Sequence, residues 1–290
     1  MAPSDIRPGV PFLLVEMPNW TPHSGFQLLA IEGRYAIQEM ALVGDRGGGK
    51  TALLVTDYAV HVQCHADPAT NLEVPGPYRP WKGILFRRTY KEFDTLIERS
   101  KDVFYNLFGD VRVGGRSHYL EGEMKWQFYD ERANPYPDVY LLFSHMEHDS
   151  DVDRWIGNDF QWIGYDELPQ WNTPRAYLKM FAALRASKPD IPMRVRSTGN
   201  PGSTGIAWIK ERFQIPDGPK EIVKKRSGVP IITYDANGKR MVRMFYLSLR
   251  EENVTLKRNN PNYDAHLAAA TEGDDELRKA WMEADFSSLF

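Results

Sequence analysis

A glycine-rich run near the start of the chain has the residue types and the spacing of a phosphate-binding loop. It fits the pattern G-x-x-x-x-G-K-[ST] without a mismatch. Glycines let backbone N–H groups approach phosphate oxygens, Lys50 supplies a positive charge to the outer phosphates, and Thr51 supplies a hydroxyl to Mg²⁺. We therefore expect the loop to bind ATP; a glycine-rich turn without a ligand is the alternative. The predicted ATP-binding residues of the loop are Gly44, Asp45, Arg46, Gly47, Gly48, Gly49, Lys50 and Thr51.

The segments on both sides of this loop support the prediction. Residues 40–43 form an apolar run that ends in glycine, which is typical of a buried parallel strand. Beyond the loop, the apolar residues of 50–65 recur at the spacing of an amphipathic helix. A helix that begins at the loop directs the positive end of its dipole at the phosphates. Strand, loop and helix in this order are the context that the pattern requires.

An acidic pair follows a second apolar stretch. Residues 160–165 are predicted to form a buried strand, and Asp166 and Glu167 come directly after it. One carboxylate at this point can coordinate Mg²⁺, and the other can accept a proton from an attacking water. We assign Asp166, together with Thr51, to the metal, and Glu167 to catalysis as the general base. The alternative is that the pair caps the next helix.

A third polar group ends the predicted strand 192–197. The ends of strands at the carboxyl edge of an open α/β sheet face the ligand crevice. We therefore expect Thr198 and Asn200 to sense the γ-phosphate or to position water. The alternative is that Asn200 and Pro201 only form a turn.

Three more side chains, one of them within the loop, are further candidates. Gln27 lies upstream of the loop and could read the adenine edge through its amide; a surface glutamine is the alternative. Arg46 could contact phosphates within its own subunit, whereas Arg154 could reach the nucleotide of a neighbouring subunit. An ion pair with Asp151 or Asp153 is the alternative for Arg154. Both arginines are candidates for the catalytic arginine that stabilises charge developing on the γ-phosphate.

The composition limits the kind of protein and the kind of partner. The chain has 290 residues, of which 42% are hydrophobic, as in an ordinary globular protein. A net charge of −3 means that contact with DNA must be a local patch, transient, or shared among subunits around a channel. The single cysteine, Cys64, permits no intramolecular disulfide and fits a reducing cytosol. No apolar run approaches the roughly 18 residues of a membrane span, so we expect no membrane contact.

Several other polar groups are interpreted as surface. His145, His148 and the acidic residues of 149–153 have the composition of a metal site, but a polar loop is the simpler interpretation. The sole cysteine is expected to be a small buried hydrophobic residue. Some basic residues are candidates for DNA contact, but we interpret them as solvated surface: Arg87, Arg88, Lys188, Arg194 and the run 220–226.

Predicted strands alternate with predicted helices along most of the chain, which favours a mainly parallel sheet covered on both faces. We expect an α/β, three-layer P-loop NTPase of the ASCE type with a small C-terminal lid or linker subdomain. Residues 1–215 would form the ATPase core with an N-terminal arm, and 216–290 the lid or linker subdomain with the last strand. The predicted strands are 40–43, 83–87, 125–129, 139–143, 160–165, 192–197 and 243–249; the predicted helices are 26–31, 50–65, 90–108, 177–185, 263–270 and 275–284.

Taken together, the motifs resemble those of the large terminase subunits of tailed bacteriophages. The similarity lies in the phosphate loop with its internal Arg46, in residues 163–168 (IGYDEL) and in residues 194–202 (RVRSTGNPG). The last run, continued by 208–213, is the most specific piece. Residues 245–249 and 260–263 are also similar to the segment that follows these motifs in the family. The resemblance extends from about residue 27 to the end of the chain.

Members of that family are ATP-driven motors that thread viral DNA into a preformed capsid through a portal ring. The resemblance implies that Lys50 and Thr51 bind phosphate and Mg²⁺, that Asp166 is the acid on the metal side and that Glu167 is the catalytic base. As partners it implies double-stranded DNA, a portal protein, a small terminase subunit and further copies of the chain in a ring on the procapsid, in the host cytoplasm. The motif that would couple hydrolysis to movement consists of Ser197, Thr198, Gly199 and Asn200.

Whole members of the family also carry a C-terminal nuclease domain of the ribonuclease-H type. The segment after Pro201 is too short for the remaining sheet edge and such a domain, so we expect no nuclease activity from this chain. It would be an excised ATPase domain, or a packaging protein whose nuclease is elsewhere. Two other functions remain open: a different P-loop translocase of the helicase-like kind, and a non-catalytic scaffold that binds nucleotide and docks on the portal. A two-lobed helicase needs a second motor lobe, and a scaffold would not require Lys50, Asp166 and Glu167 together.

Overall fold

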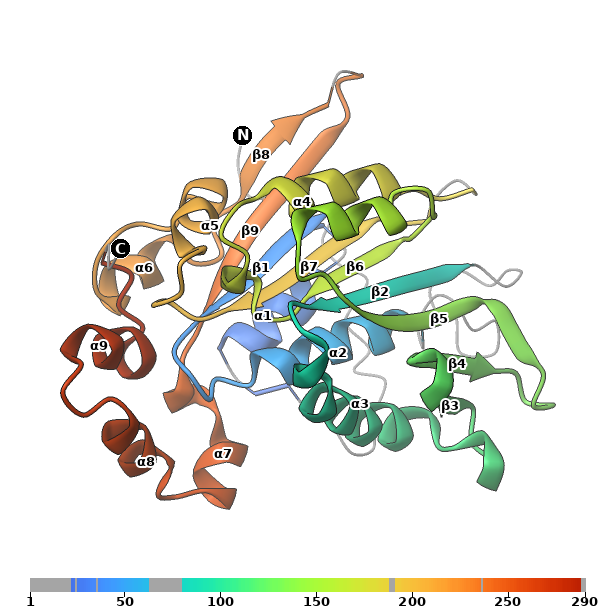
Figure 1. Cartoon of the computed structure of the whole chain (residues 1–290), viewed down its shortest axis with the longest axis horizontal. Helices are drawn as coiled ribbons and strands as arrows, with labels where there is room; N and C mark the ends of the chain where they lie inside the picture. The colour runs from blue at the N-terminus through green and yellow to red at the C-terminus, as the bar shows by residue number, and fades with distance from the viewer. Residues whose placement is uncertain are drawn as a thin grey trace.

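A sheet of nine strands forms the centre of the computed structural model, which describes residues 22–23, 25–34, 36–62, 80–187, 191–235 and 237–287 (Figure 1). The strand order is β3-β4-β5-β2-β6-β7-β1-β9-β8. The six strands from β5 to β9 are parallel, and β4, β3 and β8 add antiparallel edges. The strands are β1 (Glu39–Gly44), β2 (Trp81–Arg87), β3 (Ser117–Leu120), β4 (Lys125–Tyr129), β5 (Pro135–His145), β6 (Trp162–Tyr165), β7 (Arg194–Gly199), β8 (Ile231–Tyr234) and β9 (Arg240–Ser248).

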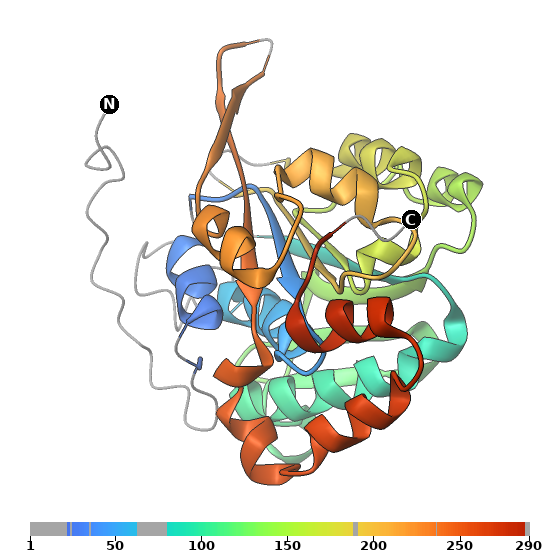
Figure 2. The same ribbon diagram turned by 90° about the vertical axis from the view of Figure 1, so that its left-hand side faces the viewer.

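Helices cover both faces of the sheet, and three more lie beyond its edge (Figures 1 and 2). One face carries α1, α2 and α3, the other carries α4 and α5 with α6 beside them, and α7, α8 and α9 lie together next to the glycine-rich loop. The helices are α1 (Phe26–Gly33), α2 (Lys50–His61), α3 (Phe93–Phe108), α4 (Arg175–Lys179), α5 (Ile206–Phe213), α6 (Lys220–Arg226), α7 (Val254–Asn259), α8 (Tyr263–Ala270) and α9 (Asp275–Glu283). Short 3-10 helices include η3 (Tyr90–Glu92), η4 (Val111–Val113), η5 (Glu121–Glu123), η6 (Asp149–Arg154), η7 (Leu168–Gln170), η8 (Met180–Ala183) and η9 (Arg250–Glu252).

Buried side chains alternate along the central strands, which is why the sheet has two apolar faces. In β1, Ala41 and Val43 join the core cluster under α4 and α5, whereas Met40 and Leu42 join the cluster under α1. Successive side chains of a strand point to opposite faces, so one apolar run contributes to two cores. This double burial explains why β1 is apolar throughout and confirms the expected three-layer fold with its mainly parallel sheet.

Most predicted strands and helices are present, and the differences have local causes. The helix predicted over 177–185 begins at Arg175 and continues as 3-10 turns only to Ala183, because Leu184 leaves the helix and pairs with Phe160. The edge strands β3 and β8 and the helix α7 were not predicted. The predicted N-terminal arm up to residue 21, Cys64 and Lys188 lie outside the described residues.

The last strand, β9, belongs to the central sheet. It pairs with the whole length of β1, from Glu39 opposite Arg243 to Gly44 opposite Ser248. The polypeptide after residue 215 therefore returns to the sheet before it forms α7, α8 and α9. The division into 1–215 and 216–290 stays a prediction.

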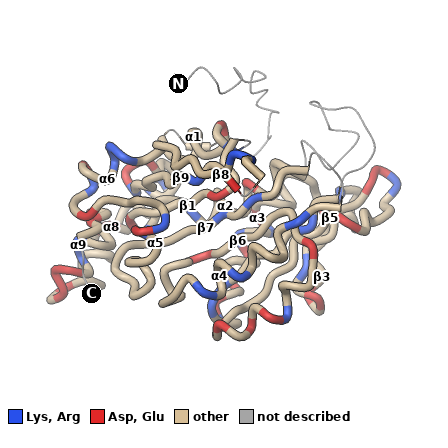
Figure 3. The backbone as a smooth tube through the Cα atoms, turned by 90° about the horizontal axis from the view of Figure 1, so that it is seen from above, with Lys and Arg blue, Asp and Glu red and all other residues tan. Residues whose placement is uncertain are grey.

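Charged residues are mixed over the described part of the chain. Figure 3 shows lysines and arginines interspersed with aspartates and glutamates, with a group of basic residues on α6. This distribution fits the small net charge of −3. Among the described residues, no helix combines the length and the apolar character needed to cross a membrane.

A buried ion pair joins α2 to β7 beneath the site. The carboxylate of Asp57 accepts hydrogen bonds from Arg196 Nε at 3.1 Å and from the indole N–H of Trp162 at 2.9 Å. Burial opposes ionisation, but the guanidinium groups of Arg196 and Arg194 outweigh it and hold the pKa of Asp57 below its usual range. Arg196 also donates to the carbonyls of Arg34 and Ile37, each at 3.1 Å. The pair fixes the helix that follows the loop against the sheet.

We predict that Asp57→Ala destabilises the protein by about 3–5 kcal/mol at neutral pH, because it leaves the Arg196 cation buried without its carboxylate. Urea denaturation measures the change. Asp94→Ala, at an exposed position on α3, is the control and should shift stability by less than about 0.5 kcal/mol. Equal effects of the two substitutions would show that the buried pair does not stabilise the fold.

Candidate active site

The glycine-rich loop joins β1 to α2, as the sequence predicts. Gly49 precedes α2 with φ of 86°, a left-handed conformation that favours glycine. Gly44 lies so close to the Ser248 carbonyl oxygen of β9 that a Cβ atom there would overlap it. The two glycines therefore allow the turn into α2 and the close approach to β9 that together form the cradle.

Lys50 lies buried inside this cradle. Its ammonium group donates to the backbone carbonyl oxygens of Gly44, at 3.3 Å, and Asp45, at 2.5 Å. Burial lowers the pKa of Lys50, although the charges of Glu167 and Asp45 oppose the shift. A buried cation whose partners are mostly neutral carbonyls favours the arrival of an anion. This environment suits a phosphate oxygen.

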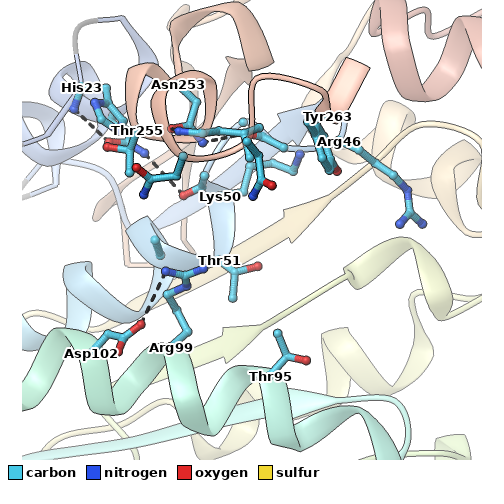
Figure 4. Close-up of a pocket in the computed structure, with 18 of the residues that line it drawn as sticks. His23, Arg46, Lys50, Thr51, Thr95, Arg99, Asp102, Asn253, Thr255 and Tyr263 are labelled. Atoms are coloured by element: carbon cyan, nitrogen blue, oxygen red, sulfur yellow. Dashed lines mark hydrogen bonds and ion pairs between the residues drawn. The ribbon is translucent and has the colours of Figure 1, made fainter. Parts of the chain in front are cut away.

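A cavity of about 720 Å³ opens over the loop (Figure 4). Its walls come from the loop and the start of α2, from α3 across the cavity, and from the segment around α7 and Tyr263. Figure 4 shows Thr95, Arg99 and Asp102 of α3 opposite Lys50 and Thr51. The polar lining residues that the sequence did not indicate are His23, Thr95, Arg99, Asp102, Asn106, Asn253, Thr255, Asn259, Asn260 and Tyr263.

Asp166 is the most connected carboxylate of the site. It follows β6, is fully buried, and accepts hydrogen bonds at Oδ1 from the hydroxyl groups of Thr51, at 2.9 Å, and Thr198, at 2.7 Å. The two residues assigned to the metal therefore meet, and their role in binding an ion stays a prediction. A hydroxyl and a carboxylate oxygen at one point are ligands that Mg²⁺ prefers.

Arg87 was interpreted as solvated surface, and this interpretation is wrong. It ends β2, whose Phe86 lies opposite Tyr165 of β6, so its side chain reaches the next residue, Asp166. Both Nε, at 2.8 Å, and Nη2 donate to Asp166 Oδ2. The signal was available: a basic residue at the carboxyl end of a buried strand faces the same edge as the acidic pair.

Two other basic positions also differ from the surface interpretation. Arg194 is 1% exposed, because it begins β7 in the middle of the sheet. Arg88 is half-buried and donates to the Gln170 carbonyl oxygen. A buried strand can carry arginines when carboxylates, carbonyl groups or aromatic faces lie within reach, which composition alone does not reveal.

Glu167 lies at the cavity in a backbone conformation that is unusual for its type. Its φ of 58° is left-handed, and its backbone N–H donates to the Thr198 hydroxyl at 2.9 Å. Asn200 Nδ2 donates to both carboxylate oxygens of Glu167 at 2.8 Å. Burial and the negative charge of Asp166 raise the pKa of Glu167, while Lys50, Arg46 and Arg87 oppose that rise. The group is an oriented carboxylate of increased basicity, as a general base requires.

Only half of the predicted coupling motif, residues 197–200, faces the acidic pair of Asp166 and Glu167. Thr198 and Asn200 contact the acidic pair, whereas the Ser197 hydroxyl donates to the Met40 carbonyl inside the sheet at 3.4 Å, and Gly199 packs against Pro169. Alternation along β7 explains this division. The buried Oδ1 of Asn200 has no hydrogen-bond partner among the described residues, and Asn200 lines the cavity.

Gln27 lines the same cavity from α1. It is 3% exposed, so the alternative of a surface glutamine is wrong. Its Oε1 accepts from the backbone N–H of His23 at 2.9 Å, and its Nε2 lies 3.4 Å from the Gly49 carbonyl oxygen. A role of Gln27 in recognising a base stays a prediction.

Asp45 differs from the other loop residues because its side chain leaves the cavity. The buried carboxylate accepts from the backbone N–H of Arg250 at 2.6 Å, on the outer side of the loop. Burial raises the pKa of Asp45 to about 6, although Lys50 and Arg250 oppose the shift. Any contact of this residue with phosphate would have to come from its backbone.

The two candidate arginines lie in different places. Arg46 lines the cavity, but in Figure 4 its side chain extends away from Lys50. Arg154 does not line the cavity; it ends η6, is exposed, and forms an ion pair with the half-buried Asp151 at 3.2 Å. Within one subunit, Arg46 therefore lines the cavity and Arg154 does not.

The acidic residues near His148 have structural partners. Asp151 accepts from the backbone N–H groups of Glu147 and His148 and so begins η6. Asp153 pairs with Lys179, and Asp149 accepts from Thr173 at 3.0 Å. Among the described residues, no group of three or more potential ligands could hold a metal ion.

The fold and the site define a class of protein. A phosphate loop follows β1, the acidic pair follows β6, and β7 lies between these two strands. This is the three-layer α/β fold of a P-loop NTPase of the ASCE type, in which an additional strand separates the loop from the catalytic glutamate.

Solved structures place the fold more closely. The large terminase of a thermophilic bacteriophage matches with a TM-score of 0.58 and 11% identity, over 92% of this chain and 54% of that one. The complex of that terminase with ADP matches with a TM-score of 0.57 and 9% identity, over 91% of this chain and 54% of that one. An arginine-to-alanine mutant of the large terminase ATPase domain of Thermus phage P74-26 matches with a TM-score of 0.57 and 14% identity, over 93% of this chain and 96% of that one.

The chain therefore has the fold of the ATPase domains of phage large terminases, as the sequence resemblance implies. It spans about half the length of the first of these proteins, 54%, and nearly all of the isolated P74-26 domain, 96%. No protein-family model matches the chain, and no curated protein matches it.

The raised pKa of Asp45 predicts a pH-dependent stability. The native state holds this proton up to about pH 6, whereas the unfolded chain releases it near 3.8, so the free energy of unfolding falls as pH rises between these values. We expect Asp45→Asn, which keeps an acceptor for the Arg250 N–H, to be more stable than the wild type at pH 8 by about 1–3 kcal/mol. Near pH 4 the difference should vanish.

Urea denaturation at pH 4 and pH 8 measures both effects, and exposed Glu131→Gln is the control. An Asp45→Asn variant that is no more stable than the wild type at pH 8 would contradict the burial cost assigned to this carboxylate.

Proposed function

We propose that this chain is the ATPase motor domain of a viral terminase, which uses ATP hydrolysis to move double-stranded DNA into a procapsid. One observation carries the proposal: the oriented carboxylate of Glu167 faces the same cavity as the phosphate loop, with Asp166 fixed beside it. The shared fold with phage large terminases supports the motor assignment over other P-loop proteins. The portal protein, the small terminase subunit and a ring of copies on the procapsid, in the host cytoplasm, are proposed on the same basis.

In this proposal the triphosphate lies along the loop. Lys50 exchanges its two backbone carbonyl partners for outer phosphate oxygens, and the N–H groups at the start of α2 bind the same chain of phosphates. Gln27, which lines the cavity from α1, is placed to meet the base. The phosphate charge compensates the buried ammonium group.

Thr51 and Asp166 would hold Mg²⁺. Their oxygens lie 2.9 Å apart, and Thr51 lines the cavity. Hydroxyl and carboxylate oxygens suit this ion, so the residues fit it. When bound, the ion supplies positive charge to the phosphate oxygens. Arg87, on the other oxygen of Asp166, fixes the orientation of that carboxylate.

Hydrolysis depends on Glu167 in this proposal. Its carboxylate accepts a proton from the water that attacks the γ-phosphate, and the bidentate contact with Asn200 fixes its direction. The unpartnered Oδ1 of Asn200 gives the same water a second acceptor. A scaffold that only bound nucleotide would not require a carboxylate held in a left-handed backbone conformation. We therefore favour an enzyme over a scaffold.

The first test separates binding from chemistry. Lys50→Ala should weaken binding of ATP by roughly 10- to 100-fold, because it removes a charge-assisted contact. Glu167→Gln should leave binding nearly unchanged and lower kcat by about 10²–10⁴-fold, because an amide cannot accept the proton. Calorimetric titration with ATP and release of phosphate, each with and without DNA, measure the two effects.

The exposed variant Glu98→Gln on α3 is the matched control and should resemble the wild type. Hydrolysis by Glu167→Gln at the wild-type rate would remove the general base from the proposal. An activity that DNA does not change would favour a nucleotidase over a motor.

Arg154 supplies the second test, which concerns assembly. Arg154 is itself exposed, so its ion pair with the half-buried Asp151 is open to solvent on the arginine side, and a neighbouring nucleotide could draw the guanidinium group away. Arg154→Ala should lower the hydrolysis rate of the assembled protein by about 10³-fold or more. Mixing Arg154→Ala with Lys50→Ala subunits should restore part of the activity, because some interfaces then join an intact Arg154 to an intact Lys50.

The control mixture replaces Arg154→Ala by Arg132→Ala, a change at an exposed residue of the β4–β5 turn. This mixture should hydrolyse ATP in proportion to its intact loops. Absence of recovery in mixtures that demonstrably co-assemble would exclude a role of Arg154 across subunits and leave Arg46 as the catalytic arginine.

A further inference from the structure

An arginine of the phosphate loop is stacked on an aromatic ring of the last helix. The guanidinium carbon of Arg46 lies 3.6 Å from the centre of the Trp281 ring, on α9. The backbone N–H of Arg46 donates to the Trp281 carbonyl oxygen at 3.0 Å. In Figure 4 the Arg46 side chain points away from Lys50, although Arg46 itself lines the cavity.

The same arginine is within electrostatic reach of the chemistry. Its charge adds to the burial that lowers the pKa of Lys50, and it opposes the rise in the pKa of Glu167. Because Arg46 is exposed, its side chain can turn about its rotatable bonds. The guanidinium group therefore has two alternative partners: the Trp281 ring or an anion on the loop.

The backbone of α9 is held independently of the Trp281 ring. Arg250 lies near the carbonyl oxygens of Trp281 and Met282, at 3.5 and 3.4 Å, and its own N–H donates to Asp45 at 2.6 Å. On its other side α9 packs against Gly202, where a Cβ atom would lie 3.0 Å from the Ala280 methyl carbon. The helix thus contacts both the phosphate loop and the loop that follows Asn200, and its position does not rest on the stacked ring alone.

We propose that Trp281 is a positioning residue that holds Arg46 away from the nucleotide until bound phosphates draw the guanidinium group off the ring. This inference rests on the proposed function, since it requires a phosphate ligand on the loop. The stacking contact competes with phosphate binding, so loss of the ring increases affinity. When Arg46 leaves Trp281, α9 loses a contact with the loop, and the occupancy of the site is transmitted to the C-terminal helix layer.

The test is a double-mutant cycle on nucleotide affinity. Calorimetric titration with Mg²⁺ and a non-hydrolysable ATP analogue is carried out on the wild type, Trp281→Leu, Trp281→Phe, Arg46→Ala and the double variant Trp281→Leu with Arg46→Ala. We expect Trp281→Leu to bind the analogue about 2- to 30-fold more tightly, the range that a cation–π contact allows. Trp281→Phe, which keeps a weaker aromatic face, should lie between the wild type and Trp281→Leu.

The cycle separates stacking from a structural role. In the Arg46→Ala background, Trp281→Leu should change affinity by less than about 2-fold, because the competing contact is already absent. A ring that mattered only for packing of α9 would have the same effect in both backgrounds. Trp208→Phe, which alters a tryptophan on α5 outside the cavity, is the matched control and should not change affinity.

Each outcome decides between the two proposals. If the wild type binds no analogue, the proposed function itself fails. If the wild type binds but both Trp281 variants bind equally or more weakly, or the effect persists without Arg46, only the role of Trp281 is overturned. Thermal unfolding identifies a misfolded Trp281→Leu, and Trp281→Phe with and without Arg46 then decides the question.

Discussion

The burial of one carboxylate, Asp166, is the constraint on which the rest of the site depends. A fully buried carboxylate is costly unless its oxygens are compensated. Here the compensation comes from three other segments of the chain: Thr51 from the start of α2, Arg87 from the end of β2 and Thr198 from the end of β7. These contacts require that the strands end at one level, which parallel pairing with a matched register provides.

That register also places Glu167, the proposed general base. Tyr165 lies opposite Ser197, and two residues after Tyr165 the backbone N–H of Glu167 donates to the side-chain hydroxyl of Thr198, which follows Ser197. Asn200 then fixes the Glu167 carboxylate from the next turn. The left-handed conformation of Glu167 is maintained because both its N–H and its side chain have partners. An increased basicity of the carboxylate follows from its burial beside Asp166.

The phosphate loop has a second set of contacts on its outer side. Asp45 and Arg46 turn toward Arg250 and Trp281, whereas Lys50 and Thr51 turn toward the cavity. Neighbouring residues of one loop thus contact the sheet on one side and the helix layer α7–α9 on the other. In the proposed role of Trp281, a phosphate that draws Arg46 off the ring acts on both sides. Physically, this is how a change at the phosphates can reach a distant helix: through packed groups with two alternative partners.

The amino-acid sequence alone was enough to indicate the phosphate loop, the acidic pair, the polar end of β7 and the central parallel strands. Each of these is a local pattern in which spacing and apolar character suffice. Only the tertiary structure decided which side chains meet: it joined Arg87 to Asp166, buried Gln27 and Arg194, and turned Asp45 and Ser197 away from the cavity. It also added the walls from α3 and α7, and the edge strands β3 and β8. These facts depend on strand order and register between segments far apart in the chain, which no local periodicity encodes.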